Sequence, residues 1–310
     1  MYKVFIDGKA GTTGLRLEQR LSERPDIELV SIEENLRKDL KARLDCIAES
    51  DISFLCLPDE SSVEIIAALG DMECCVLDCS TAHRTATGWV YGIPELEEGI
   101  FGAKRISVPG CHATGFIMSV RPLIDAGILD PMAEISFHSL TGYSGGGKTM
   151  IAEYEECGKA PRQYALAQAH KHIPEMHIYS GLKTAPFFSP VVCDYYSGML
   201  VGVPLPRGAL RRGATVESVK EELAARYEGC PFVKVREIGD EFSETAGAGY
   251  LSAEAFAGRD DIEIFVTGKD DKIEIVSRYD NLGKGASGAA IQNLNILLGM
   301  PEATGLVLGA

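Results

Sequence analysis

Tyr2-Lys3-Val4-Phe5-Ile6-Asp7-Gly8-Lys9-Ala10-Gly11-Thr12-Thr13-Gly14 is the stretch that decides the fold. Its first six residues are an apolar-rich run of strand length, and a helical pattern through Leu15, Leu17 and Leu21 follows the glycines. A strand, a glycine-rich turn and a helix in this order let backbone N–H groups meet a pyrophosphate at a helix N-terminus. The spacing Gly-x-x-Gly-x-x-Gly differs from the commoner G-x-G-x-x-G, so a plain strand-to-helix turn is the alternative.

More strands are expected after this opening. They are the apolar runs Ile27 to Ser31, Asp51 to Leu57, Cys74 to Asp78 and Arg105 to Val108. A helix is predicted over Val63 to Leu69, with Ser61 or Ser62 as its N-cap. Strands that alternate with helices predict a Rossmann-type parallel sheet.

Charged residues follow the second predicted strand and bear on the choice of cofactor. Glu33 and Glu34 could hold a ribose hydroxyl, as in sites that prefer NAD. Arg37 and Lys38 could instead meet a 2′-phosphate, and a solvated loop of mixed charge is a third interpretation. The spacing does not separate these alternatives.

Polar residues also follow the fourth predicted strand, in Cys79-Ser80-Thr81-Ala82-His83-Arg84. Ligands of open α/β sheets bind outside the carboxyl ends of the strands, so this cluster is well placed. Arg84 could grip a phosphate with two N–H groups, or it could form an ordinary surface ion pair.

Cys111 lies in Ser107-Val108-Pro109-Gly110-Cys111-His112-Ala113-Thr114-Gly115. Pro109 and Gly110 indicate a tight turn, and a helix is predicted over Ala113 to Leu123. A thiol near a helix N-terminus ionises more easily, and the thiolate is the nucleophile. The alternative is a buried cysteine before a buried helix.

From Ala133 onward the pattern changes to an α+β, mainly antiparallel domain. Expected strands cover Glu134 to Thr141, Phe187 to Pro206 with a turn near Tyr196 to Gly198, Phe232 to Glu237, and a hairpin of Ile262 to Thr267 and Lys272 to Arg278. An amphipathic helix is expected over Val216 to Tyr227. The stretch from Asp280 to Ala290 opens a last helix through Leu298.

Two motifs in this middle region could carry chemistry. Gly142 to Thr149 fits the letters of a P-loop, but a flexible loop that presents backbone N–H groups and Lys148 to an anion is the preferred interpretation. His170 and His172 precede a Pro-Glu that would start a helix. They could bind a metal, but no third ligand stands at a fixed spacing. They could also supply the acid and base that thiol chemistry needs.

Composition limits the partners. The formal net charge of −15 argues against nucleic acid or an anionic membrane as the main partner. The start of the chain lacks the apolar stretch of a signal peptide, and no segment approaches the length that spans a bilayer. Nine cysteines without regular spacing favour reduced thiols in a cytoplasm, and we expect no metal site.

These pieces together resemble the shorter subtype of the N-acetyl-gamma-glutamyl-phosphate reductase family of arginine biosynthesis, and more distantly aspartate-semialdehyde dehydrogenase. The most specific matching motifs are Val108-Pro109-Gly110-Cys111 and His170-Lys171-His172-Ile173-Pro174-Glu175. Further matches are the Gly8 to Gly14 loop, Asp78 to Arg84, Tyr91 to Leu96, Ser144 to Gly147 and Asp280 to Ala286.

The resemblance implies a reaction and its residues. NADPH would reduce N-acetyl-L-glutamyl 5-phosphate to the 5-semialdehyde through a thioester on Cys111, with phosphate as the other product. His172, in preference to His170, would handle the proton. The expected phosphate and substrate contacts are Arg84, Ser144, Gly145 and Lys148. The expected cofactor contacts are Gly8, Gly11, Thr12, Thr13, Gly14, Arg37, Ser80, Asn281, Gly283, Lys284 and Gly285.

The resemblance also implies a domain division and an assembly. Residues 1–111 with 281–310 would bind the dinucleotide, and residues 112–280 would carry catalysis and oligomerisation. A homodimer or homotetramer is expected. An aspartate-semialdehyde dehydrogenase and a non-catalytic NADP-binding sensor remain as alternatives.

Overall fold

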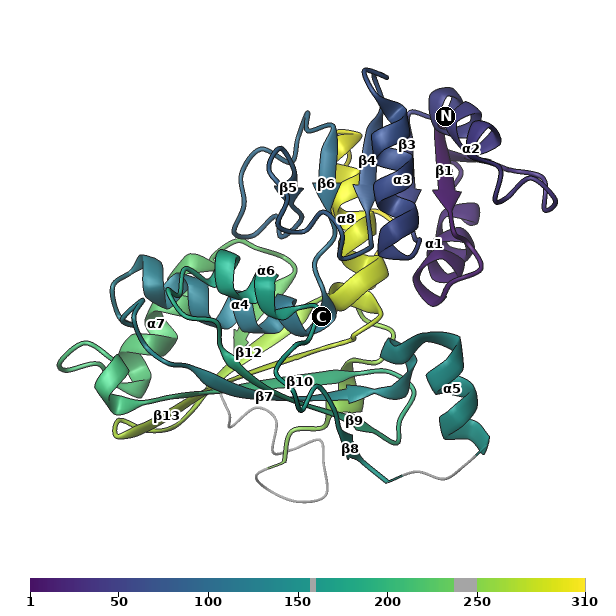
Figure 1. Ribbon diagram of the computed structural model, residues 1–310. Helices are drawn as coiled ribbons and strands as arrows, with labels where there is room; N and C mark the ends of the chain where they lie inside the picture. Colours follow the sequence, from purple (N-terminus) through teal and green to yellow (C-terminus); the bar gives the residue numbers. More distant parts are fainter. Residues whose placement is uncertain (157–159, 237–249, 310) are drawn as a thin grey trace. The chain divides into compact units, whose positions relative to one another are not determined.

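The computed structural model describes residues 1–156, 160–236 and 250–309, which fall into two compact units (Figure 1). One unit comprises Met1–Pro109 and Ala286–Leu306, and the other comprises Gly110–Gly285 and Val307–Ala310. The chain therefore passes from the first unit to the second immediately before Cys111.

The first unit is a parallel sheet with helices on both faces. Its elements are β1 (Tyr2–Asp7), α1 (Thr12–Ser22), β2 (Ile27–Val30), α2 (Leu40–Glu49), β3 (Ile52–Leu55), α3 (Asp59–Leu69), β4 (Cys75–Asp78), β5 (Val90–Tyr91), β6 (Arg105–Ser107) and α8 (Gly288–Leu297). The strand order is β2-β1-β3-β4-β6-β5. Helices α1 and α8 pack on one face and α2 and α3 on the other. Because both faces are covered, all four residues of β3 are buried.

The second unit is a seven-stranded mixed sheet. Its elements are α4 (Cys111–Asp125), β7 (Ser136–Gly142), η1 (Tyr143–Gly146), α5 (Gly147–Glu156), β8 (Arg162–Gln163), α6 (Ile173–Ser180), β9 (Phe187–Cys193), β10 (Met199–Leu205), η2 (Arg207–Ala209), α7 (Val216–Arg226), β11 (Val233–Arg236), η4 (Ala253–Phe256), β12 (Ile262–Lys269), β13 (Lys272–Tyr279) and the π-helical turn η5 (Gly283–Ser287). The strand order is β11-β12-β13-β10-β7-β9-β8. The β7–β9 and β11–β12 pairs are parallel, and the remaining pairs of the described strands are antiparallel.

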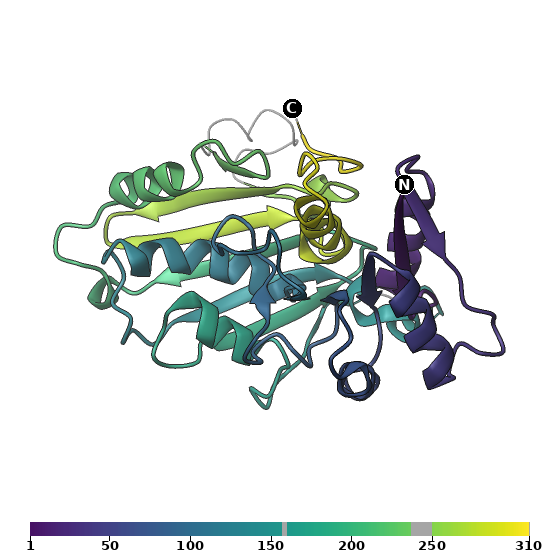
Figure 2. The ribbon, with the colours of Figure 1, turned by 90° about the horizontal axis from the view of Figure 1, so that it is seen from above.

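Helices α4 and α7 lie on the same face of this sheet (Figures 1 and 2). The hydroxyl of Ser119 on α4 meets that of Ser277 on β13 at 2.7 Å, which identifies the face that α4 covers. Burial alternates along β9, as expected of a strand with one covered face. The predicted fold class, a Rossmann-type domain beside a mainly antiparallel one, is confirmed.

Three local predictions were wrong. Helix α3 begins at Asp59 after Pro58, so neither Ser61 nor Ser62 is its N-cap; Ser62 is buried and donates to Asp78. Helix α4 begins at Cys111, two residues earlier than predicted. The segment from Ser144 to Lys148, predicted as a loop, is instead a 3₁₀ turn that leads into α5. Glu237, the predicted end of β11, lies outside the described residues.

Candidate active site

Cys111 is the first residue of α4 and is partly exposed. The Tyr279 hydroxyl on β13 donates to the carbonyl oxygen of Cys111 at 2.5 Å and accepts from the N–H of Gly115 at 3.1 Å. A Cβ on Gly115 would lie 2.7 Å from this hydroxyl oxygen, so only glycine fits there. The sheet therefore fixes the first turn of the helix that carries the thiol.

The residues on either side of Cys111 are held as well. Gly110, the N-cap of α4, donates its N–H to the buried carboxylate of Glu175 on α6 at 3.1 Å. Gly285 packs directly against Cys111, because a Cβ there would lie 2.9 Å from the Cys111 Cβ. The N-terminus of α4 favours a thiolate at this position.

His112, the next residue, is buried on the inner face of the sheet. Its Nδ1 lies 2.7 Å from the Ser139 hydroxyl, and its Nε2 lies 2.6 Å from the Tyr164 hydroxyl. Burial, and then the nearby charge of His170, lower the pKa of His112 to about 3. His112 is therefore neutral at physiological pH, with one ring nitrogen as donor and the other as acceptor.

His170 and His172 join His112 in one cluster. Their ring centroids lie 4.7 Å apart, and each is less than 6 Å from the His112 ring. The N–H of His172 donates to Nδ1 of His170 at 3.1 Å. His172 is buried at the N-cap of α6, as the Pro-Glu signal predicted. The structure thus brings the two predicted histidines together with a third one.

Tyr164 completes this group. Burial, and then the charge of the Cys111 thiolate, raise the pKa of Tyr164 far above its usual value, so the phenol keeps its proton. The local sequence patterns predict no role for His112, Tyr164, Tyr279 or Glu175. His112 could have been found, because it follows Cys111 in the first turn of a predicted helix. Tyr164 stands in no motif and gave no signal.

The predicted substrate residues of the second unit lie beside a predicted cofactor residue. The side-chain amide of Asn281 donates to the Ser144 hydroxyl at 3.1 Å, and its oxygen accepts from the N–H of Gly198 at 2.9 Å. Gly145 adjoins the same amide, whereas Lys148 is exposed on α5.

Two other predicted cofactor residues, Gly283 and Lys284, pack inside the second unit. Gly283 packs against the carbonyl of Arg259. The buried Lys284 ammonium lies 5.1 Å from the centre of the Phe232 ring.

In the first unit, the glycine loop lies where the strand order reverses between β1 and β3. Gly8 has φ +85°, and a Cβ there would lie 2.3 Å from the carbonyl oxygen of Cys56. A Cβ on Gly14 would likewise collide with the carbonyl of Gly8. Gly11 is the N-cap of α1. The buried Thr12 hydroxyl has no hydrogen-bond partner in the described part of the chain. Thr13 follows in the same turn. A dinucleotide pyrophosphate fits this arrangement, because it would supply that missing partner at a helix N-terminus.

A pocket with about 310 Å³ of space, open to solvent, adjoins this loop. Its lining comes from β1, the glycine loop, α1, the end of β2 and the two residues after β2: Phe5, Ile6, Lys9, Glu18, Leu29, Val30, Ser31 and Ile32. Beyond it, exposed Arg37 pairs with Glu34 at 2.8 Å, and Arg43 donates to the Arg37 carbonyl at 2.8 Å. The Nε of Arg43 lies 3.5 Å from Asp7, whose pKa burial raises to about 6.

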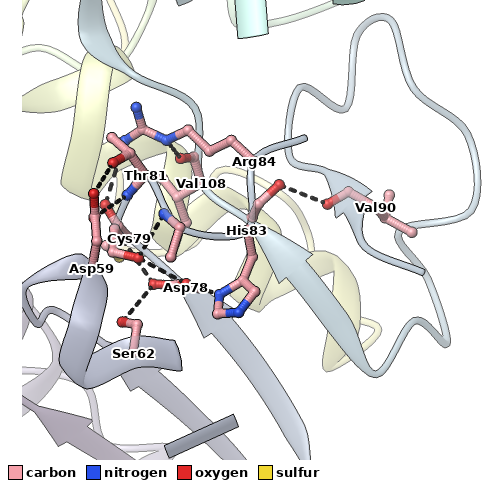
Figure 3. A network of polar contacts seen from close by, with 12 residues as sticks. Asp59, Ser62, Asp78, Cys79, Thr81, His83, Arg84, Val90 and Val108 are labelled. Carbon is pink, nitrogen blue, oxygen red and sulfur yellow. Dashed lines mark hydrogen bonds and ion pairs between the residues drawn. The ribbon is translucent and has the colours of Figure 1, made fainter. Parts of the chain in front are cut away.

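Ser80 and Arg84 follow β4 (Figure 3). The Ser80 hydroxyl donates to Asp78 at 2.9 Å, and the Nε of Arg84 donates to the carbonyl oxygen of Val108 at 2.9 Å. Arg84 is buried, so the alternative interpretation of Arg84 as a member of a surface ion pair is wrong.

The sequence matches two family models. Residues 3–101 match the semialdehyde dehydrogenase NAD binding domain, and residues 111–281 match the semialdehyde dehydrogenase dimerisation domain. Among solved structures, aspartate semialdehyde dehydrogenase II from Vibrio cholerae has a TM-score of 0.73 at 17% identity, over 96% of this chain and 98% of that one. At this identity, the likeness shows a shared fold alone.

Curated relatives match over almost their whole length. "N-acetyl-gamma-glutamyl-phosphate reductase 2" of Nostoc sp. is 44% identical over 98% of this chain and 99% of its own. The N-acetyl-gamma-glutamyl-phosphate reductase of Sinorhizobium medicae is 41% identical over 96% and 98%. With a partly exposed cysteine on a helix N-terminus, a histidine cluster beside it and a dinucleotide-type glycine loop, the chain belongs to the N-acetyl-gamma-glutamyl-phosphate reductase family of semialdehyde dehydrogenases.

Proposed function

We propose that this protein reduces N-acetyl-L-glutamyl 5-phosphate to N-acetyl-L-glutamate 5-semialdehyde with NADPH and releases inorganic phosphate, a step of arginine biosynthesis. The observation that carries the proposal is Cys111 at the first turn of α4, with its carbonyl held by Tyr279 and the histidine cluster following it. The names of relatives at 39–44% identity support the same substrate.

The chemistry begins at the sulfur. The Cys111 thiolate attacks the acyl carbon, the bond from that carbon to the phosphate oxygen breaks, and phosphate leaves. The product is a thioester on Cys111. NADPH, when bound, supplies the hydride that reduces this thioester.

We assign the proton transfers to His172, with His170 beside it. His172 holds the proton of the thiol and returns it to the sulfur when the reduced intermediate collapses to the aldehyde. The neutral His112 does not take this role, because its pKa of about 3 makes it a poor base. It positions the Tyr164 hydroxyl instead.

Binding is divided among the remaining predicted residues. Arg84, Ser144, Gly145 and Lys148 contact the substrate and its phosphate. Gly8, Gly11, Thr12, Thr13 and Gly14 hold the pyrophosphate of NADP(H). Arg37 meets the 2′-phosphate, and Ser80, Asn281, Gly283, Lys284 and Gly285 lie toward the nicotinamide end. The orphaned Thr12 hydroxyl supports the cofactor assignment.

The dimerisation model that matches residues 111–281 indicates an oligomer, and we propose a homodimer. The face of the second sheet opposite α4 carries apolar side chains that are only partly buried: Leu140, Phe187, Val191, Leu200 and Val276. A sheet face that carries several partly exposed apolar side chains is suited to contact with a second copy of itself. Pairing of two such dimers would give the homotetramer.

The test is the reverse reaction, in which N-acetylglutamate semialdehyde, phosphate and NADP⁺ give NADPH, followed by absorbance. Replacing Cys111 by alanine should lower kcat by on the order of 10⁴-fold, because the nucleophile is lost. NADP⁺ binding should persist. Cys230→Ala, at another partly exposed cysteine, is the control and should keep its activity.

Substrate identity is tested in the same assay. Wild-type protein should prefer N-acetylglutamate semialdehyde over aspartate semialdehyde. Full activity of Cys111→Ala would refute the mechanism, and a preference for aspartate semialdehyde would refute the substrate. Cofactor binding with an unreactive Cys111 thiol would indicate a sensor.

A further inference from the structure

The segment that follows β4 is wrapped around a buried carboxylate (Figure 3). Asp78 is fully buried and accepts four hydrogen bonds. They come from the Ser62 hydroxyl at 3.2 Å, the N–H and hydroxyl of Ser80 at 2.8 and 2.9 Å, and Nδ1 of His83 at 2.6 Å. An anion buried this completely is stable only when such bonds replace water.

The ring of His83 is held from two directions. Nδ1 donates to Asp78, and the ring stacks on Trp89 with 4.4 Å between centroids and 13° between planes. His83 is nearly fully buried. Asp78 also holds Ser80, the neighbour of Cys79, and its own carbonyl accepts from the N–H of Val108 at 2.8 Å, so the carboxylate that holds His83 also ties down the segments around Arg84.

Arg84 is locked by a different set of bonds. Its Nε donates to the carbonyl of Val108 at 2.9 Å, and its Nη2 donates to the carbonyl of Cys79 at 3.4 Å. Val108 lies three residues before Cys111 in the chain, just after β6. These two bonds fix the plane of the guanidinium. The Cys79 carbonyl lies at the start of the segment, and the Val108 carbonyl lies just after β6.

We propose that Asp78 and His83 act as a positioning pair that orients the Arg84 guanidinium to receive the phosphate of the substrate. The inference rests on the proposed function. An arginine side chain is rich in rotamers, so a guanidinium that is already fixed loses little conformational freedom when it binds an anion. Neither Asp78 nor His83 touches the phosphate.

His83 variants test the pair in the reverse assay. His83→Phe keeps a ring against Trp89 but removes the donor to Asp78, so the KM for phosphate should rise about tenfold while kcat stays within about threefold. His83→Gln places its N–H near the former Nε2 and should behave the same way. His83→Asn places its N–H near the former Nδ1 and should restore the wild-type KM.

A double-mutant cycle separates positioning from a purely structural role. In an Arg84→Gln background, His83→Phe should cause no further rise in the KM for phosphate, because its effect acts through Arg84. Thr81→Val, which removes the exposed hydrogen bond that the Thr81 hydroxyl donates to Asp59, is the matched control and should leave that KM unchanged. Additive effects in the cycle, or an unchanged KM in both His83→Phe and His83→Gln, would overturn the proposal.

A second readout needs no turnover: it is the binding of inorganic phosphate to the protein, measured by calorimetry. The Kd for phosphate should rise in His83→Phe and His83→Gln as it does in Arg84→Gln, and Thr81→Val should leave it unchanged. A wild-type Kd in His83→Gln contradicts the positioning role. A wild-type protein that is inactive with N-acetylglutamate semialdehyde but binds phosphate in this way contradicts the proposed substrate alone.

Discussion

At the scale of single residues, the three clustered histidines differ in the surroundings of their rings. His112 lies between Ser139 and Tyr164 and is buried, so its charged form is costly. His172 caps α6, and its N–H binds His170. The motif around His170 could be recognised from the sequence, whereas the neutrality of His112 depends on strands far along the chain.

The low pKa of His112 predicts a pH-dependent stability. In the unfolded chain this group takes up a proton near pH 6.5, whereas in the folded protein it does so only near pH 3. As pH falls between these values, the unfolded state binds a proton that the folded state does not. The free energy of unfolding should therefore fall by up to about 1.4 kcal/mol per pH unit because of this residue.

Urea denaturation followed by circular dichroism at pH 7 and pH 5 measures this loss. His112→Asn should lose less stability than wild type between the two values, by about 1–2 kcal/mol. His138→Asn, at a half-exposed histidine on β7, should keep the wild-type loss. Equal losses in wild type and His112→Asn would contradict the prediction.

At the scale of elements, the start of α4 is defined by a strand that lies more than 160 residues away in sequence. The turn signal of Pro109 and Gly110 predicted a helix near Cys111, but placed its start at Ala113. The Tyr279 hydroxyl bridges the carbonyl of Cys111 and the N–H of Gly115, and the helix begins at Cys111 itself. No local pattern encodes such a long-range bond.

Removing this hydroxyl should affect both stability and rate. Tyr279→Phe leaves a buried carbonyl and N–H without that partner, so we expect a loss of about 1–3 kcal/mol of folding free energy. Because Cys111 is then less well placed, kcat should fall about tenfold with a small change in KM.

Tyr227→Phe is the matched control, because its buried hydroxyl donates to the carbonyl of Met118 in the same helix at 2.7 Å. It should lose similar stability and keep its kcat. Parallel losses of kcat in both variants would show that the rate follows stability and not the position of Cys111.

At the scale of the whole molecule, the first unit contains the glycine loop and the second contains Cys111 at the start of α4. Within the described residues, no helix is both long and apolar enough to cross a membrane. The partly exposed apolar side chains on one face of the second sheet predict contact with another copy of the chain. Phe187 lies on this face and is 56% exposed.

Phe187→Lys should shift the protein toward monomers in sedimentation velocity experiments, because it places a charge within the proposed apolar contact. Phe101→Lys changes an even more exposed phenylalanine of the first unit and should leave the mass unchanged. An unaltered oligomer in Phe187→Lys would place the interface elsewhere.

The sequence alone determined the strand, glycine turn and helix of residues 2–22, because hydrophobic period and turn chemistry act between neighbours in the chain. It also indicated Cys111 and His172, since their motifs are local. Only the tertiary structure decided the charge state of His112, the burial of Arg84 and the true start of α4. Each of these depends on desolvation and on hydrogen bonds from segments distant in sequence, and a local pattern does not specify them.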